Sequence, residues 1–521
     1  MTSERAGIHP LVLIGLACGP FISMVDSNAV NVAIPGIARE MDSTVSTVGW
    51  IVGAYLLGIG AFLPATAWLA DRFGNRRVYM AALAAFGTAS AACAFAPTIE
   101  ALIALRGAQG VASAPMIPLA LALLFADKQD GRRARPPMAA GLCFFLAPAL
   151  GPSAGGLLVD TAGWRWIFLV NVPLVIVGLL AGLKLPRDRP VARADRRPLD
   201  MVGMLLLAAG ATGVVLSSSI IPTDARLGWP IALVGVDLLA AYIWWQLPLR
   251  RPALSLGLVK SLAGAIPVAV SVVASLVLFA VLFLIPIFMM EVQGRSAVAT
   301  GLVLLPQGIV MGLCTGLGEK LVGSLGFRAT VGGGMLVLAA TSALLLLVTP
   351  GTAAWLLALL LAGRGIALGL TLQPIIMGTL GRLPRTEVAD VSTLFNVVQR
   401  LGGSLGVAGF AAFYQFRSSV AGTGSAVPFH ETVWLMTGLA LAGALLALFL
   451  PGRPAREEHE DTCETAPDRL VARAPQPEQQ PGSVHNCPNC NHPIAITTLM
   501  LPSPMDVTTI TTGPNRIPAT R

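Results

Sequence analysis

Two charged residues lie inside long apolar stretches, where a lipid bilayer would force each to find a partner or water. Asp26 interrupts the stretch from Pro10 to Pro35, and Arg106 lies within the stretch 99–126. The proton affinity of a carboxylate depends on its access to water and on its distance from a guanidinium, so a conformational change that alters either one moves protons. We therefore expect Asp26 to accept a proton or cation and Arg106 to modulate it. A permanent structural ion pair is the alternative.

A polar loop follows the second apolar stretch and reads Asp71-Arg72-Phe73-Gly74-Asn75-Arg76-Arg77. Gly74 permits a tight chain reversal, and Asp71 can pair with arginines or with a helix N-terminus. The basic residues hold such a loop at one face of a membrane. Five residues of the loop are candidates for a functional role at this face: Asp71, Arg72, Gly74, Arg76 and Arg77. A loop that does no more than fix orientation is the alternative.

Glycine and proline cluster in the fifth apolar stretch, as Gly151-Pro152-Ser153-Ala154-Gly155-Gly156. Small residues let two bilayer helices approach closely, and proline kinks a helix. Both properties suit a gate that seals one side of a membrane carrier, so we assign gating to four of these residues: Gly151, Pro152, Gly155 and Gly156. A helix pair that is simply well packed is the alternative.

The C-terminal tail carries a compact group of possible zinc ligands: His485, Cys487, Cys490 and His492. One Cys-x-x-Cys pair with histidines this close does not easily surround a tetrahedral ion, because zinc fingers separate their ligand pairs by about a dozen residues or more. We therefore expect no bound metal, and these four residues are only weak candidates. The tail is rich in Pro, Glu, Arg and Thr, a composition typical of disordered segments.

Membrane-spanning helices must position the candidate residues that lie outside the tail. The chain is 55% hydrophobic and 12% charged, whereas soluble domains carry about a quarter charged residues. Apolar runs long enough to span a bilayer recur from Pro10 to Pro451. They predict an all-α membrane protein with fourteen spans, near residues 10–35, 48–70, 78–96, 99–126, 139–159, 167–185, 200–221, 229–247, 263–289, 299–317, 329–348, 354–379, 390–416 and 430–450.

These spans divide as six, two and six. We predict an N-terminal six-helix bundle at 1–185, a basic loop with two additional central helices at 186–262, a C-terminal six-helix bundle at 263–451 and a cytoplasmic tail at 452–521. A weak repeat supports duplicated halves, because Arg364-Gly365 resembles Arg106-Gly107. A second similarity relates the loop around Gly74, between spans two and three, to the segment between spans ten and eleven. That segment contains Gly316, Gly323, Gly326 and Arg328.

Basic residues are unequally distributed among the predicted loops. Alternate loops carry 20 Lys and Arg in one set and 5 in the other. Lys and Arg resist translocation, so the first set and both termini should lie in the cytoplasm. The net charge of +8 then reflects membrane topology, and we expect no nucleic-acid partner.

Taken together, the motifs of residues 10–451 resemble those of the major facilitator superfamily, and in particular its 14-spanner drug:proton antiporters. The loop at Asp71 is similar to the signature loop of the superfamily, and Arg106-Gly107-Ala108-Gln109-Gly110 is similar to its RxxQG motif. Gly151 to Gly156 resembles the motif that marks exporters, while 24–35 and 163–173 resemble further antiporter segments. Two departures, Ala67 for glycine and Asn75 for a basic residue, predict looser packing of the second span.

The resemblance implies the major facilitator fold and a transporter rather than an enzyme. The implied activity is proton-coupled export of drugs or antibiotics, as amphipathic or cationic small molecules, by a monomer in the bacterial cytoplasmic membrane. The chain has no GxxxxGK[ST] loop for ATP, so the proton gradient supplies the energy and no cofactor is expected. The resemblance also implies gating roles for Gln109 and Gly110 and for the loop residues Asp71, Arg72, Gly74, Arg76 and Arg77. It further implies a substrate cavity, to which we assign Asn31, Tyr55, Gln293 and Asn396.

Three alternatives stay open at this point. The same fold could export a self-made antibiotic, siderophore or amino acid, or it could serve as a receptor whose tail binds metal or a partner. Asp237 lies inside the eighth predicted span. It is either a peripheral aspartate next to lipid or a residue that contacts substrate.

Overall fold

The computed structural model describes residues 10–125, 138–185, 199–247, 257–258, 261–383, 388–421 and 426–451, together with two short strands in the tail. The chain forms one compact unit, Met1–Ala455, and a separate tail unit, Arg456–Arg521. In the tail, β1 (His485–Asn486) pairs antiparallel with β2 (Pro493–Ile494). The remainder of the tail lies outside the described residues, and with it the segment predicted to be disordered and the metal candidates Cys487, Cys490 and His492.

The first half contains nine helices among its described residues. Several long apolar segments are divided by proline, which removes a backbone donor: Pro64 lies between α2 and α3, and Pro115 between α5 and α6. The helices are α1 (Pro10–Glu40), α2 (Val45–Phe62), α3 (Ala65–Phe73), α4 (Asn75–Ala94), α5 (Ile99–Ser113), α6 (Met116–Phe125), α7 (Met138–Ala162), α8 (Arg165–Leu169) and α9 (Asn171–Gly182).

The remainder of the described compact unit is also helical. The central pair is α10 (Met201–Ile220) and α11 (Ala225–Gln246). The second half follows as α12 (Leu262–Ile287), the π-helical turn η3 (Phe288–Val292), α13 (Ala297–Leu325), α14 (Phe327–Leu344), the 3₁₀ turn η4 (Leu345–Leu347), α15 (Ala354–Gly369), α16 (Leu372–Leu380), α17 (Val388–Ala421) and α18 (Val427–Ala447).

Twelve helical segments among the described residues are long and apolar enough to cross a membrane. A multi-span membrane protein is thereby confirmed, but the predicted count of fourteen is not. The two predicted spans outside the twelve correspond to α7 and α17, which have 25 and 34 residues. Polar side chains interrupt α17 at Asn396, Gln399 and Arg400, and they lower its hydropathy.

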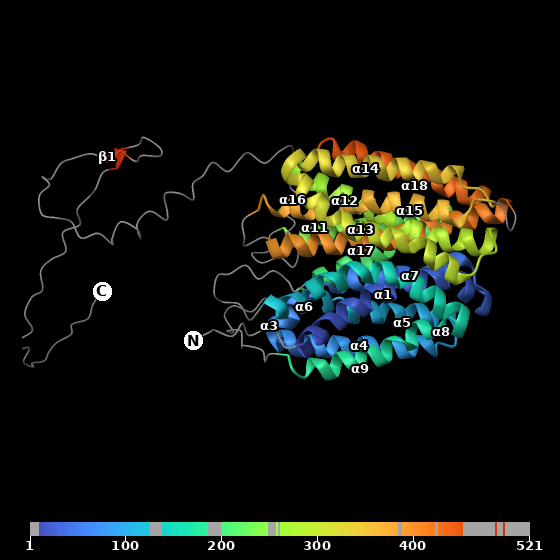
Figure 1. Cartoon of the computed structure of the whole chain (residues 1–521), viewed down its shortest axis with the longest axis horizontal. Coiled ribbons are helices and arrows are strands. Elements are labelled where there is room, and N and C mark those ends of the chain that lie inside the picture. Colours follow the sequence, from blue (N-terminus) through green and yellow to red (C-terminus); the bar gives the residue numbers. More distant parts are fainter. Residues whose placement is uncertain are drawn as a thin grey trace, which may run out of the picture. The chain divides into compact units, whose positions relative to one another are not determined.

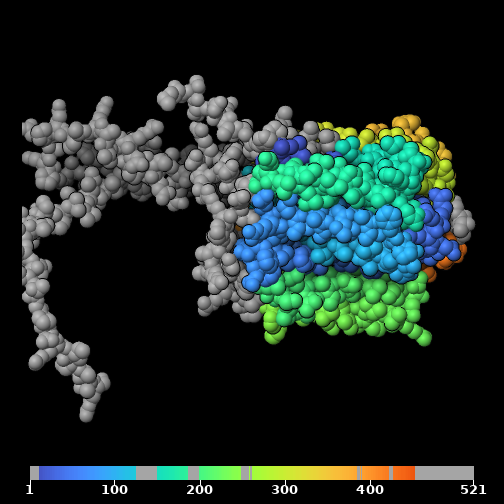
Figure 2. All heavy atoms as spheres, turned by 90° about the horizontal axis from the view of Figure 1, so that it is seen from below, coloured from blue at the N-terminus to red at the C-terminus, as the bar shows by residue number. Residues whose placement is uncertain are grey.

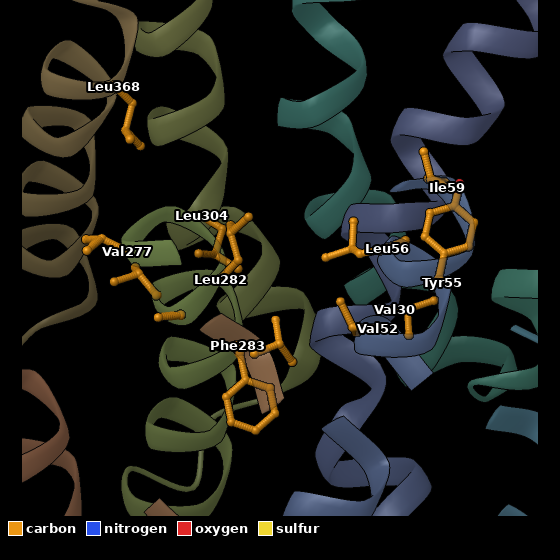
Figure 3. Close-up of a cluster of buried hydrophobic side chains, with 14 of the residues drawn as sticks. Val30, Val52, Tyr55, Leu56, Ile59, Val277, Leu282, Phe283, Leu304 and Leu368 are labelled. Atoms are coloured by element: carbon orange, nitrogen blue, oxygen red, sulfur yellow. The ribbon is translucent and has the colours of Figure 1, made fainter. Parts of the chain in front are cut away.

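The helices of the two halves lie side by side in two groups, blue to cyan for the first half and yellow-green to orange for the second (Figure 1). The groups meet where α7 packs against α13 and where α2 packs against α17. Apolar side chains line this boundary: Val52 and Leu56 of α2 lie on one side, and Leu282 and Phe283 of α12 on the other (Figure 3). The end of the bundle that carries α3 is called the α3 end below, and the opposite end the α8 end.

The central pair packs on the outside of this arrangement. Figure 2 shows it in green, along one edge of the face formed by the blue and cyan helices. Helix α10 contacts α2 and α17, whereas α11 packs mainly against α10. Asp237 is exposed on α11, which places it at the periphery of the helical unit.

A structural repeat relates the two halves. Gly74 and Gly326 both have φ of +94°, a conformation that favours glycine, and each opens the helix that follows. Two residues later, Arg76 donates to Leu183 O at 3.0 Å and Arg328 donates to Leu450 O at 2.6 Å. The predicted match to the Gly74 loop is correct at Gly326. It is wrong at Gly316 and Gly323, which do not lie in a loop, because α13 continues as a helix to Leu325.

Candidate functional site

Asp26 and Arg106 form an ion pair whose two side chains are completely buried, with 2.5 Å between Oδ2 and Nη1. The second carboxylate oxygen accepts a hydrogen bond from Asn171 Nδ2 at 2.8 Å and a weaker one from Gln109 Nε2 at 3.4 Å. Helices α1, α5 and α9 thus bring together four residues that are up to 145 positions apart. Three donors, from Arg106, Asn171 and Gln109, therefore converge on one buried carboxylate.

Asn171 is a site residue that sequence reasoning did not assign. It also donates to Ser90 Oγ at 3.0 Å, and Ser90 in turn donates to Phe168 O at 2.9 Å. The available signal was its position in the segment 163–173, which resembles an antiporter motif. Nothing in the spacing indicates that its amide reaches Asp26, because that contact depends on how α9 packs against α1.

The guanidinium of Arg106 is held from several sides. Its Nε donates to Ile51 O at 3.2 Å and its Nη1 to Gln109 Oε1 at 2.7 Å. The ring of Tyr55 lies 4.2 Å from the guanidinium carbon, within the range of a cation–π interaction. Nη2 has no hydrogen-bond partner among the described residues, so this buried cation is only partly satisfied.

A chain of hydroxyl groups leads from Tyr55 to the larger of two described cavities. Tyr55 Oη donates to Ser113 Oγ at 3.0 Å, and Ser113 Oγ lies 2.5 Å from Ser23 Oγ. Ser23 and Ser113 both line this cavity. Polar groups therefore extend from the cavity wall to the tyrosine ring that covers Arg106.

The larger cavity has a volume of about 460 Å³ and reaches Asp71 and Asn75 at the α3 end. A smaller chamber of about 120 Å³ lies between α1, α7, α12 and α13, and Arg400 lines both spaces. The larger volume falls within the roughly 300–1,000 Å³ typical of small-molecule sites. Its walls are mostly apolar and include Ile59, Leu63, Ile117 and Leu121.

The four residues assigned to a substrate cavity lie in different environments. Asn396 lines the larger cavity. Asn31 and Tyr55 are fully buried and line neither described cavity. Gln293 follows η3 and donates to Thr352 O at 3.1 Å. Neighbouring helices enclose Asn31 and Tyr55, and the sequence alone does not reveal that enclosure.

The glycine cluster of α7 contacts two helices at once. A methyl group added at Gly151 would lie 2.7 Å from Asn28 Cβ, and one at Gly155 would lie 2.7 Å from Ala29 O, both on α1. One added at Gly156 would lie 2.3 Å from Ala297 O on α13. Such distances leave no room for a side chain, so α7 touches both neighbours backbone to backbone.

A carboxylate caps this contact at the α8 end. Asp160 on α7 accepts hydrogen bonds from Ala297 N at 3.1 Å and from Val298 N at 2.8 Å. These are the first backbone donors of α13, and a carboxylate at a helix N-terminus is favourable. The two halves are therefore joined at the α8 end, while the larger cavity lies toward the α3 end.

The family model of the Major Facilitator Superfamily matches residues 16–407. The chain belongs to this superfamily. It is 32% identical to the multidrug resistance protein B homolog of Mycobacterium tuberculosis, over 76% of this chain and 74% of the relative. It is 28% identical to the multidrug export protein EmrB of Escherichia coli, over 79% and 81% of the two chains.

Solved structures support the fold. A crystal structure of a D-xylose-proton symporter superposes with a TM-score of 0.61 at 14% identity, covering 85% of this chain and 98% of the symporter. The predicted family and the major facilitator fold are thus confirmed, and with them a transporter rather than an enzyme. The orientation of the termini and the monomeric state stay predictions.

Proposed function

We propose that this protein is a proton-coupled antiporter that exports drugs or antibiotics across the bacterial cytoplasmic membrane, as a monomer with fourteen spans. The buried Asp26–Arg106 pair is the observation that carries the proposal, because ionisable residues enclosed among membrane-spanning helices commonly serve as proton carriers in transporters. The names of the two relatives, a multidrug resistance protein and a multidrug export protein, support the cargo class.

In this proposal α7 and α17 are the two further spans, and both termini lie in the cytoplasm, as the distribution of Lys and Arg among the loops favours. The α3 end then faces the cytoplasm, so the larger cavity is on the side from which an exporter takes up cargo. The contact of Asp160 with α13 closes the opposite side. The arrangement corresponds to the loading state of an alternating-access cycle.

Proton coupling acts through the donors around Asp26. Protonation removes the charge that Arg106, Asn171 and Gln109 stabilise, so the contacts joining α1 to α5 and α9 weaken together. The hydroxyls of Ser23, Ser113 and Tyr55 offer a route for the proton from the cavity. A proton can shift the equilibrium between the loading state and the opposite state only if it binds one of them more tightly. Here the loss of these hydrogen bonds on protonation disfavours the loading state and provides that difference.

Transport by Asp26→Asn in everted vesicles tests the proposal. We expect the variant to lose drug movement driven by a proton gradient, because Asn cannot titrate. Asp237→Asn is the matched control, since it makes the same change in another predicted span but on the exposed face of α11. Undiminished proton-driven transport by a stably folded Asp26→Asn protein would refute the coupling role, as would failure of an uncoupler to stop efflux by the unmodified protein.

A further inference from the structure

Arg400 is a charged residue that the coupling mechanism does not use. It lies on α17, is partly buried, and lines both the larger cavity and the smaller chamber. Among the described residues it makes no hydrogen bond or ion pair. Arg106, by contrast, is neutralised by Asp26, and neither member of that pair lines a described cavity.

A second unsatisfied polar group faces the same chamber. Gln307 on α13 is 3% exposed, and its Oε1 has no partner among the described residues. The oxygen and nitrogen of a glutamine amide can exchange places by a rotation, so this side chain can present either an acceptor or a donor. Asn28 and Ser27 of α1 complete the polar part of the chamber wall.

Among the described residues, two acidic ones line the larger cavity, and none lines the smaller chamber. Asp71 and Asp390 line the larger cavity, and both have polar partners of their own. The smaller chamber has no acidic residue in its lining, which is otherwise apolar at positions such as Leu278, Phe279 and Leu304. An enclosed guanidinium without a counter-charge is unfavourable, and an anion that pairs with it gains that interaction.

We infer that the cavities bind amphipathic organic anions, with a sulfonate or carboxylate on Arg400 and Gln307 and an apolar body in the larger cavity. This inference rests on the proposed export function and specifies its cargo. A guanidinium suits such headgroups because its planar fork donates two parallel hydrogen bonds. A cationic headgroup at the same place would be repelled by Arg400. Of the amphipathic or cationic compounds that the resemblance implies, the site therefore favours amphipathic anions.

Binding of two matched dyes to the full chain in lipid nanodiscs tests the inference. 1-Anilinonaphthalene-8-sulfonate carries a sulfonate, and N-phenyl-1-naphthylamine is the same molecule without it. Signal from nanodiscs lacking protein is subtracted. Loss of one charge-assisted hydrogen-bonded contact should raise the Kd of the sulfonate about tenfold or more in Arg400→Gln. The Kd of the neutral dye should stay within about twofold, and Arg400→Lys should lie between the other two proteins.

Two results would overturn the inference. One is an unchanged sulfonate Kd in Arg400→Gln, and the other is equal weakening of both dyes, which would indicate a structural role for Arg400. Gln307→Leu provides a second variant should Arg400→Gln fail to fold, and it should also weaken the sulfonate more than the neutral dye. A protein that shows the expected dye selectivity but no proton-driven transport would refute the proposed function and leave this site intact.

Discussion

Removing one member of the Asp26–Arg106 pair should destabilise the protein far more than removing both. Each side chain is 0% exposed, so a single substitution leaves its partner as a buried charge without a counter-ion. Such a loss costs about 3–5 kcal/mol, whereas replacing both partners of a buried pair is often nearly neutral. Asn at position 26 also has only one acceptor oxygen, so its Nδ2 must face one of two donors, Arg106 Nη1 or Asn171 Nδ2.

A double-mutant cycle measures this coupling. The free energy of unfolding is determined by urea titration in mixed micelles for the unmodified protein, Asp26→Asn, Arg106→Gln and the double variant. The double variant should lose less than the sum of the single variants, by about 2 kcal/mol or more.

The exposed pair of Glu40 and Arg165 supplies the matched control. Their side chains are 49% and 42% exposed, and solvent-screened pairs of this kind contribute about 0–1 kcal/mol. The cycle of Glu40→Gln and Arg165→Gln should therefore show a coupling below about 1 kcal/mol. Additive effects at the buried pair, or equal couplings at the two pairs, would refute the direct contact between Asp26 and Arg106.

Three further predictions concern the contacts between helices. Gly156→Ala should reduce transport, because the added methyl would lie 2.3 Å from Ala297 O, whereas Gly438→Ala, with open space around it, should leave transport rates unchanged. Gly74→Ala should lower the free energy of unfolding by about 1–2 kcal/mol, because its φ is +94°, while Gly323→Ala within α13 should not lower it. Asp160→Asn should weaken the cap on α13 by about 1 kcal/mol and increase labelling by a thiol reagent of cysteines introduced at the α8 end; unchanged labelling would contradict a closing role for this contact.

The sequence by itself determined the class of protein and one of its tight turns. Long apolar runs predicted membrane helices, because a bilayer requires every backbone donor to be satisfied within its own segment. Gly74 predicted a tight turn, and the turn is present with a positive φ. Asp26 and Arg106 stood out because a charge in an apolar run is costly, and that cost also predicted that each would find a partner.

Only the tertiary structure decided which groups surround that pair and which residues face the cavities. Asn171 reaches Asp26 across 145 positions because α9 packs against α1, and no local pattern encodes that contact. Tyr55 covers Arg106 and does not line either described cavity, whereas Arg400 lines both. In a chain whose spans are apolar on every side, periodicity does not distinguish the lipid-facing side of a helix from the buried side. That choice depends on the packing between helices, which close approach at residues such as Gly156 fixes.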